Sequence, residues 1–73
     1  MLEEEKKYRL LAEALDVDIK TVSPERELAG MDEWDSLGKL AVISMLSEHF
    51  GKTLSMSNLR GFNTLRDILS EME

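Results

Sequence analysis

Cysteine is absent from this sequence of 73 residues, and proline, glycine and aromatic residues are scarce. Without cysteine the chain can form neither a disulfide framework nor a thiolate metal site. The single histidine, His49, has only Glu48 beside it as a further ligand type, so we predict no metal site. No apolar run reaches the length of a membrane span or of a signal-peptide core. We therefore expect a cytoplasmic protein with a single domain over residues 1–73.

Basic residues are also few: nine lysines and arginines stand against fifteen acids, which gives a formal net charge of −6. Nucleic-acid binding needs clustered basic side chains to neutralise phosphates, so we predict no nucleic-acid partner. An acidic surface instead suits protein partners with basic docking patches. We expect the chain to meet such partners as a monomer.

Apolar spacing predicts a first helix over residues 2–15. The residues that recur near helical spacing are Leu2, Tyr8, Leu11, Ala14 and Leu15. The exposed face carries the pairs Glu3–Lys7 and Glu5–Arg9 at i,i+4, which is a favourable order for ion pairs on a helix.

A long connection is predicted over residues 16–35. Its apolar residues can anchor it across the helices; they are Val17, Ile19, Val22, Leu28 and Met31. Ser23-Pro24 is typical of a helix start, with proline at the first helical position, and predicts one short turn over 24–28. Trp34, the only tryptophan, is predicted to be a packing anchor.

A second helix is predicted over residues 36–50. Asp35 is a good N-cap residue, and Gly51 suits the position that follows a helix end. The predicted buried stripe consists of Leu40, Ile43, Leu46 and Phe50, with Val42 on its border.

Two shorter helices are predicted after it. Residues 55–61 favour a single turn, started by Ser55 or Ser57 and stopped by Gly61. Residues 64–72 favour a final helix, because Thr64 and Asp67 have the spacing of a capping box. Its apolar face is Leu65, Ile68, Leu69 and Met72. No segment alternates as a strand would, so the sequence predicts an all-α fold, a small three-to-four-helix bundle.

The candidate functional site is Trp34-Asp35-Ser36-Leu37. Ser36 lies at the start of the second helix, where unpaired N–H groups and the helix macrodipole favour negative charge. A phosphate group on Ser36 Oγ would be stabilised there. The same residues also fit an ordinary N-cap followed by a first-turn serine with no function.

Ser36 has no general base within reach on its own helix. His49 lies thirteen residues further along, about 20 Å away at a rise of about 1.5 Å per residue. A serine–histidine–aspartate arrangement is therefore excluded. We predict that the chain is not an enzyme.

With its surroundings, the Asp-Ser-Leu tripeptide resembles the signature of the acyl carrier proteins, which stands at the start of their second helix. Val22 lies thirteen positions before Asp35, and Phe50-Gly51 closes the helix at the family's distance from the serine. The apolar positions of the family's last two helices are matched by Leu54, Leu59, Phe62, Thr64, Leu65, Ile68 and Leu69. The resemblance covers nearly the whole chain and implies a bundle of the acyl-carrier type.

In that family the serine bears a 4′-phosphopantetheine arm. The resemblance implies that a phosphopantetheinyl transferase moves the arm from coenzyme A to Ser36. The arm's thiol would hold acyl groups as thioesters for acyl-loading and acyl-processing enzymes, in fatty acid, polyketide or related biosynthesis. The implied partner contacts are Asp32, Glu33, Trp34, Asp35, Leu37, Gly38, Lys39 and Glu48. The implied lining of an acyl-chain site is Ile43, Leu46, Leu59, Phe62 and Ile68.

The second helix departs from fatty-acid carriers, which place acids along its exposed face. The corresponding positions here are Gly38, Lys39, Ala41, Ser44 and Ser47, with Glu48 the main acid that remains. Gly38 could let a partner or the arm approach the backbone closely, and Lys39 either reaches toward a phosphodiester or is solvated. The Trp-Asp-Ser-Leu sequence resembles that of stand-alone carriers of specialised pathways. Two alternatives stay open: an aminoacyl or peptidyl carrier, and a small helical adaptor without a prosthetic group.

Overall fold

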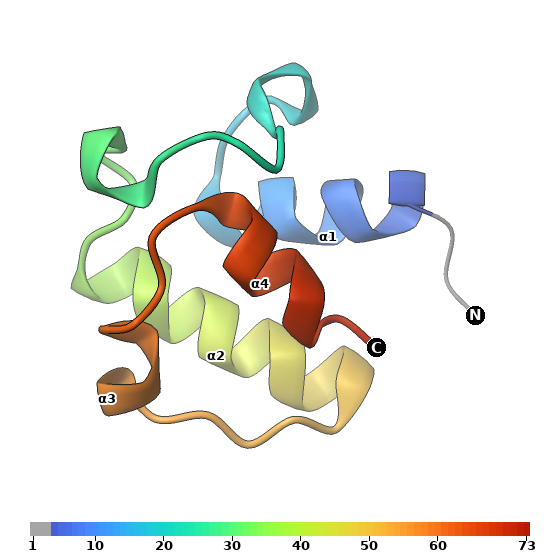
Figure 1. Ribbon diagram of the computed structural model, residues 1–73. Coiled ribbons are helices and arrows are strands. Elements are labelled where there is room, and N and C mark those ends of the chain that lie inside the picture. The colour runs from blue at the N-terminus through green and yellow to red at the C-terminus, as the bar shows by residue number, and fades with distance from the viewer. Residues whose placement is uncertain (1–3) are drawn as a thin grey trace.

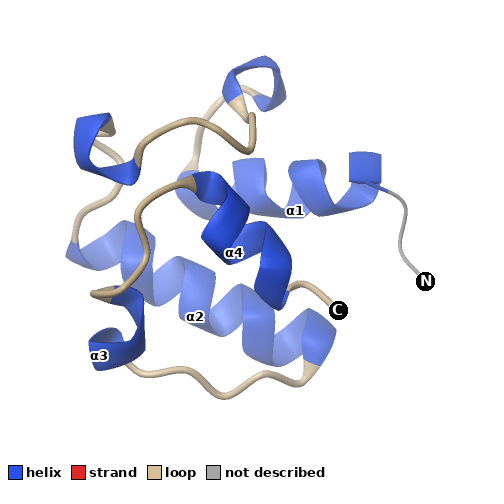
Figure 2. Ribbon diagram, in the orientation of Figure 1, coloured by secondary structure: helices blue, strands red, loops and turns tan. Residues whose placement is uncertain are grey.

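The computed structural model describes residues 4–73. The helices in this part of the chain are α1 (Glu4–Leu15), α2 (Ser36–Phe50), α3 (Met56–Leu59) and α4 (Leu65–Glu71). Two 3₁₀ turns, η1 (Ile19–Thr21) and η2 (Leu28–Gly30), lie in the long connection between α1 and α2 (Figure 1). No strand occurs among these residues (Figure 2). The predicted all-α bundle with a long loop after the first helix is confirmed.

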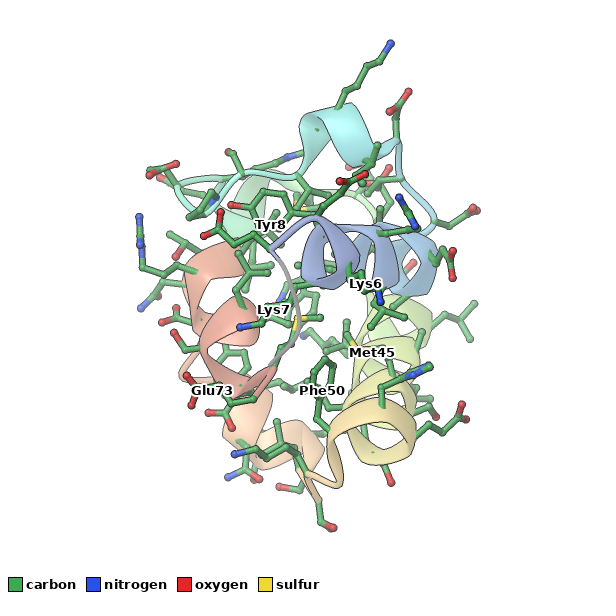
Figure 3. The ribbon with its side chains drawn as sticks, turned by 90° about the vertical axis from the view of Figure 1, so that its right-hand side faces the viewer. Lys6, Lys7, Tyr8, Met45, Phe50 and Glu73 are labelled. Carbon is green, nitrogen blue, oxygen red and sulfur yellow. The ribbon has the colours of Figure 1, made fainter. Side chains whose placement is uncertain are left out.

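The three longer helices surround one core. Figure 1 shows α4 lying over the space between α1 and α2, while the long connection passes from the end of α1 to the start of α2. The buried cluster combines Leu11, Ala12 and Leu15 of α1, Val42, Met45 and Leu46 of α2, Leu65, Ile68 and Met72 at the C-terminal end, and Val22, Leu28 and Met31 of the connection. Figure 3 shows Met45 and Phe50 pointing from α2 toward the interior of the bundle.

The predicted buried face of α2 is partly wrong. Leu40 is 52% exposed, whereas Val42 is fully buried and Met45 nearly so. Ile43 and Phe50 are half-buried, at the edge of the core. Eight residues of this helix, not counting Gly38, are apolar and lie around its axis, so periodicity alone does not select one face. Packing against α1 and α4 selects the face that carries Val42 and Leu46.

The features predicted for α1 are largely confirmed. Leu11 and Leu15 are buried, Tyr8 and Ala14 are half-buried, and Arg9 Nη2 donates to Glu5 Oε1 at 3.0 Å. Leu2 and the Glu3–Lys7 pair involve residues outside the described part. The helix ends where Asp16 takes a left-handed conformation with φ 57°, and the Val17 N–H donates to the carbonyl of Ala12 at 3.0 Å.

The first N–H groups of α4 hold the long connection in place. The Leu65 N–H donates to the Arg26 carbonyl and the Arg66 N–H donates to the Pro24 carbonyl, each at 3.0 Å. A helix cannot satisfy these first donors internally, so the connection supplies the acceptors that α4 needs. The two segments therefore stabilise each other.

The turn predicted over 24–28 is present, but it is shorter than predicted and does not start a helix. The Arg26 N–H donates to the Ser23 carbonyl at 3.1 Å, which closes a single turn there, and the 3₁₀ turns lie on either side of it. The carbonyls of Pro24 and Arg26 accept from α4, so they are not used to extend a helix. Asp18 instead caps η1, where its Oδ1 accepts from the Lys20 N–H at 2.9 Å.

Most of the predicted anchors of the connection reach the core. Val22, Leu28 and Met31 are buried, and Val17 is half-buried against them. Ile19 is an exception, at 37% exposed, because it begins η1 at the surface. Trp34 is half-buried and packs against the core, which confirms its role as an anchor.

The caps predicted for the last two helices are present. Ser55 caps α3, and its N–H donates to Asn58 Oδ1 at 2.8 Å. At the start of α4, Asp67 Oδ2 accepts from the N–H groups of Asn63 at 2.7 Å and Thr64 at 3.1 Å. These two bonds lower the pKa of the Asp67 carboxyl, against a smaller rise from burial. The stability that they contribute is present at neutral pH and is lost as the pH falls through this lowered pKa.

Two leucines of α2 give a matched test of the core. Leu46→Ala should reduce the free energy of unfolding by about 2–5 kcal/mol, because Leu46 is fully buried and its removal leaves a cavity. Leu40→Ala, on the exposed face of the same helix, should cost less than about 1 kcal/mol. Urea unfolding followed by circular dichroism measures both. Equal losses would contradict the assignment of the buried face.

Candidate functional site

The site is built on the first turn of α2. Asp35 is extended, with φ −109° and ψ −170°, and its Oδ1 accepts from the Gly38 N–H at 2.9 Å. Its carbonyl accepts from the Lys39 N–H at 2.9 Å. Asp35 is thus the N-cap residue that the sequence predicted, and Ser36 is the first residue of the helix.

Ser36 is exposed, and its neighbouring donors are free. Within residues 4–73 no acceptor bonds the backbone N–H groups of Ser36 and Leu37, and no hydrogen bond holds the Ser36 side chain. α2 is a regular helix of 15 residues, closed at its other end by Gly51 with φ 65°. Its macrodipole and the two free N–H groups therefore favour an anionic group at Ser36.

A loop folds back on this first turn. The Trp34 N–H donates to the Met31 carbonyl at 3.1 Å, and the Lys39 Nζ lies 5.7 Å from the centroid of the Trp34 ring. That distance is within the range of a cation–π contact. Lys39 therefore lies over the indole in this structure, a position that sequence reasoning did not anticipate.

Gly38 is buried, and the backbone carbonyl of Glu33 lies close to it. An added Cβ would collide with the carbonyl oxygen of Glu33 and would lie 3.2 Å from the carbonyl carbon. The expectation that a partner or the arm uses this close approach therefore needs correction. The space is already filled by the loop, and Gly38 offers little surface for a partner.

Most of the other expected contact residues lie near Ser36 in the chain, whereas Glu48 lies in the last turn of α2, at its opposite end. Asp32, Asp35 and Glu48 are exposed, Glu33 is half-buried, and Leu37 is 77% exposed. Leu40, one turn beyond Leu37, is also exposed, which sequence reasoning missed because it placed Leu40 in the core.

A hollow of about 340 Å³ lies between the end of α1 and the start of α2. Its lining consists of Ala14, Leu15, Asp16, Glu33, Asp35, Leu37, Gly38 and Ala41. The sequence did not predict that Asp16 lines this hollow, because only the fold places the end of α1 beside the start of α2. Together with Glu33 and Asp35, Asp16 gives the lining of this hollow three carboxylates.

The residues expected to line an acyl-chain site lie in the interior. Leu46, Leu59 and Ile68 are essentially fully buried, and Ile43 and Phe62 are half-buried. Leu46 and Ile68 belong to the core cluster, and Phe62 packs against it.

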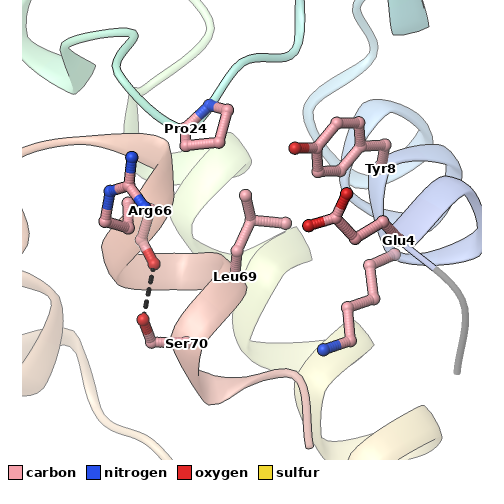
Figure 4. Close-up of a pocket in the computed structure, with 7 residues that line it drawn as sticks. Glu4, Tyr8, Pro24, Arg66, Leu69 and Ser70 are labelled. Atoms are coloured by element: carbon pink, nitrogen blue, oxygen red, sulfur yellow. Dashed lines mark hydrogen bonds between the residues drawn. The ribbon is translucent and has the colours of Figure 1, made fainter. Parts of the chain in front are cut away.

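A second surface hollow lies elsewhere and has a different lining. It measures about 190 Å³ and lies between α1, the long connection and α4 (Figure 4). It is lined by Glu4, Lys7, Tyr8, Pro24, Arg66, Leu69 and Ser70, none of them on α2. It is therefore separate from the surface around Ser36.

Residues 4–73 hold no group of three or more histidine, aspartate or glutamate side chains that could bind a metal ion. No helix in this range is long and apolar enough to cross a membrane.

Comparison with known proteins identifies the family. A family model described as "Phosphopantetheine attachment site" matches residues 8–71, which is most of the chain. No curated protein and no solved structure matches the chain significantly. The chain therefore belongs to the phosphopantetheine-attachment family.

Membership defines what the chain is. It is a carrier protein and not an enzyme, and it serves as the attachment site for a 4′-phosphopantetheine prosthetic group. A phosphopantetheinyl transferase modifies it, and it works with partner enzymes.

Proposed function

We propose that the chain is an acyl carrier protein and that Ser36 is the residue that bears 4′-phosphopantetheine. The observation that carries this proposal is the exposed Ser36 at the capped start of α2, inside the region that matches the family. The free N–H groups of Ser36 and Leu37 fit a phosphodiester, because they provide donors and positive potential beside the serine oxygen. When bound, the arm supplies a thiol that holds cargo as a thioester.

For the chemical step itself, the group that reacts on this chain is the Ser36 hydroxyl. Ser36 Oγ forms a bond to phosphorus, the anhydride bond of coenzyme A breaks, and adenosine 3′,5′-bisphosphate leaves. The single histidine of the chain, His49, stands at the far end of the 15-residue helix α2. We assign the uptake of the Ser36 hydroxyl proton to the transferase.

Ser36→Ala should abolish attachment and leave the fold intact, because an exposed side chain in the first turn contributes little to stability. The intact mass after incubation with coenzyme A and a broad-specificity transferase gives the result. Ser44→Ala, on the exposed part of the same helix, is the matched control and should gain one phosphopantetheine like the parent. Modification that persists in Ser36→Ala would refute the assignment of Ser36.

Exposed acids beside Ser36 and at the far end of α2 are proposed to guide partner enzymes. Asp32, Asp35 and Glu48 are exposed, and Leu37 adds an apolar contact at 77% exposure. Opposite charge on a partner raises the association rate, and salt largely screens this attraction beyond about 8 Å at physiological ionic strength. Lys39 reduces the negative charge of this surface, so steering should be weaker than in carriers with acids along this helix.

The association rate with the transferase should therefore fall as salt rises, but with a shallower slope than for a fatty-acid carrier measured in parallel. Stopped-flow measurements from about 20 mM to 500 mM salt would give both slopes. Glu13→Gln, which neutralises an exposed acid on α1, is a control that should keep the parental slope. An association rate that does not change with salt would contradict electrostatic steering.

An acyl rather than an aminoacyl cargo is supported by the apolar interior beneath α2. An alkyl chain could enter between α2 and α3 if Ile43 and Phe62, which are half-buried, move apart. It would then contact Leu46, Leu59 and Ile68. Each buried CH₂ would contribute about 0.8 kcal/mol, less the cost of opening the core.

A medium-length acyl chain on the arm should therefore raise the melting temperature above that of the form with the bare arm. Calorimetry on forms loaded with two-, six- and ten-carbon chains would show the trend. An acetyl group is the control, because it is too short to reach the core. A melting temperature that is the same for every chain length would mean that the cargo stays in solvent.

A further inference from the structure

The carbonyl of Glu33 occupies the place where any residue other than glycine at position 38 would carry its Cβ. The obstructing atoms belong to the backbone, which cannot turn aside as the end of a flexible side chain can. Gly38 has ordinary helical geometry, because Gly51 is the glycine with positive φ in residues 4–73. Position 38 therefore requires glycine for space and not for backbone conformation.

Three contacts hold residues 31–35 against the first turn of α2 at this point. Glu33 packs on Gly38, Asp35 Oδ1 accepts from the Gly38 N–H at 2.9 Å, and Lys39 Nζ lies over the Trp34 ring. They surround Ser36, whose own side chain makes no hydrogen bond in the described residues. The place of Ser36 is thus set by its neighbours.

We propose that Gly38 is a positioning residue for the modification of Ser36. Its missing side chain lets residues 31–35 close on α2, which fixes the first turn and the acids beside it in the arrangement that a transferase recognises. The inference rests on the proposed attachment at Ser36.

Intrinsic helix propensity predicts the opposite effect of a substitution at this position. Alanine favours a helix more than glycine does, so Gly38→Ala would strengthen an isolated α2. In the folded chain, the new Cβ must push the Glu33 carbonyl away and disturb the Asp35 cap. Helix propensity alone therefore predicts that Gly38→Ala is harmless or stabilising, whereas the clash with Glu33 predicts that it disturbs the start of α2.

The test is steady-state modification by a broad-specificity transferase, at a temperature where circular dichroism shows each variant folded. Gly38→Ala should lower kcat/KM at least tenfold, with kcat itself reduced, and should shift the Trp34 fluorescence to the red as residues 31–35 detach. A loss of stability alone would leave the kcat of folded molecules unchanged. Gly30→Ala is the matched control, because no atom lies within 4 Å of an added Cβ there, and it should keep the parental kinetics.

A folded Gly38→Ala variant that is modified within twofold of the parental rate would overturn the proposal. If Gly38→Ala does not fold, the second test is Lys39→Met. This variant leaves Gly38 in place and removes the charge that holds Trp34 of residues 31–35 against α2. Release of residues 31–35 makes its modification slower, whereas charge steering by a basic transferase makes it faster or leaves it unchanged. The latter outcomes refute the proposal. A parent chain that is not modified at all would instead refute attachment at Ser36.

Discussion

The bond from the Gly38 N–H to Asp35 Oδ1 is the interaction on which the rest of the site depends. It fixes where α2 begins, and so makes Ser36 the first residue of a 15-residue helix. The same bond brings the Asp35 carboxylate next to the serine, where it contributes to the acidic surface. A single cap therefore sets the position and the electrostatic surroundings of Ser36.

That cap is supported by the long connection, which the core and α4 hold in place. Val22, Leu28 and Met31 bury their side chains in the core, and the first N–H groups of α4 bond to the carbonyls of Pro24 and Arg26. The connection thus behaves as a structural element and not as a free loop. It delivers residues 31–35 to the start of α2, where the Glu33 carbonyl meets Gly38. A chain of only 73 residues in this way positions one serine without a large core.

Local signals in the sequence predicted the helices and their ends well. Asp35, Gly51 and the Thr64–Asp67 box act through neighbouring backbone groups, so short patterns reveal them. The buried face of α2 could not be predicted, because apolar side chains lie around the whole helix. Packing against α1 and α4 determines that Val42 is buried and that Leu40 is left exposed. The 3₁₀ turns η1 and η2 were not predicted either. The bonds from α4 to the carbonyls of Pro24 and Arg26 join residues some forty positions apart, which no local pattern indicates.

The candidate site divides in the same way. The sequence pointed to Ser36 and its cap, but the role of Gly38 depends on a contact with Glu33 that only the folded loop creates. Asp16 reaches the site because α1 ends beside the start of α2, and no spacing in the sequence indicates this.

Attachment at Ser36 can be tested most directly on the unaltered chain by peptide mass mapping. Cleavage after Arg26 and Lys39 releases residues 27–39, in which Ser36 is the only residue with a hydroxyl group. After incubation with coenzyme A and a transferase, this peptide and no other should gain the mass of one phosphopantetheine. The added mass on any other peptide, or no added mass at all, would contradict the account.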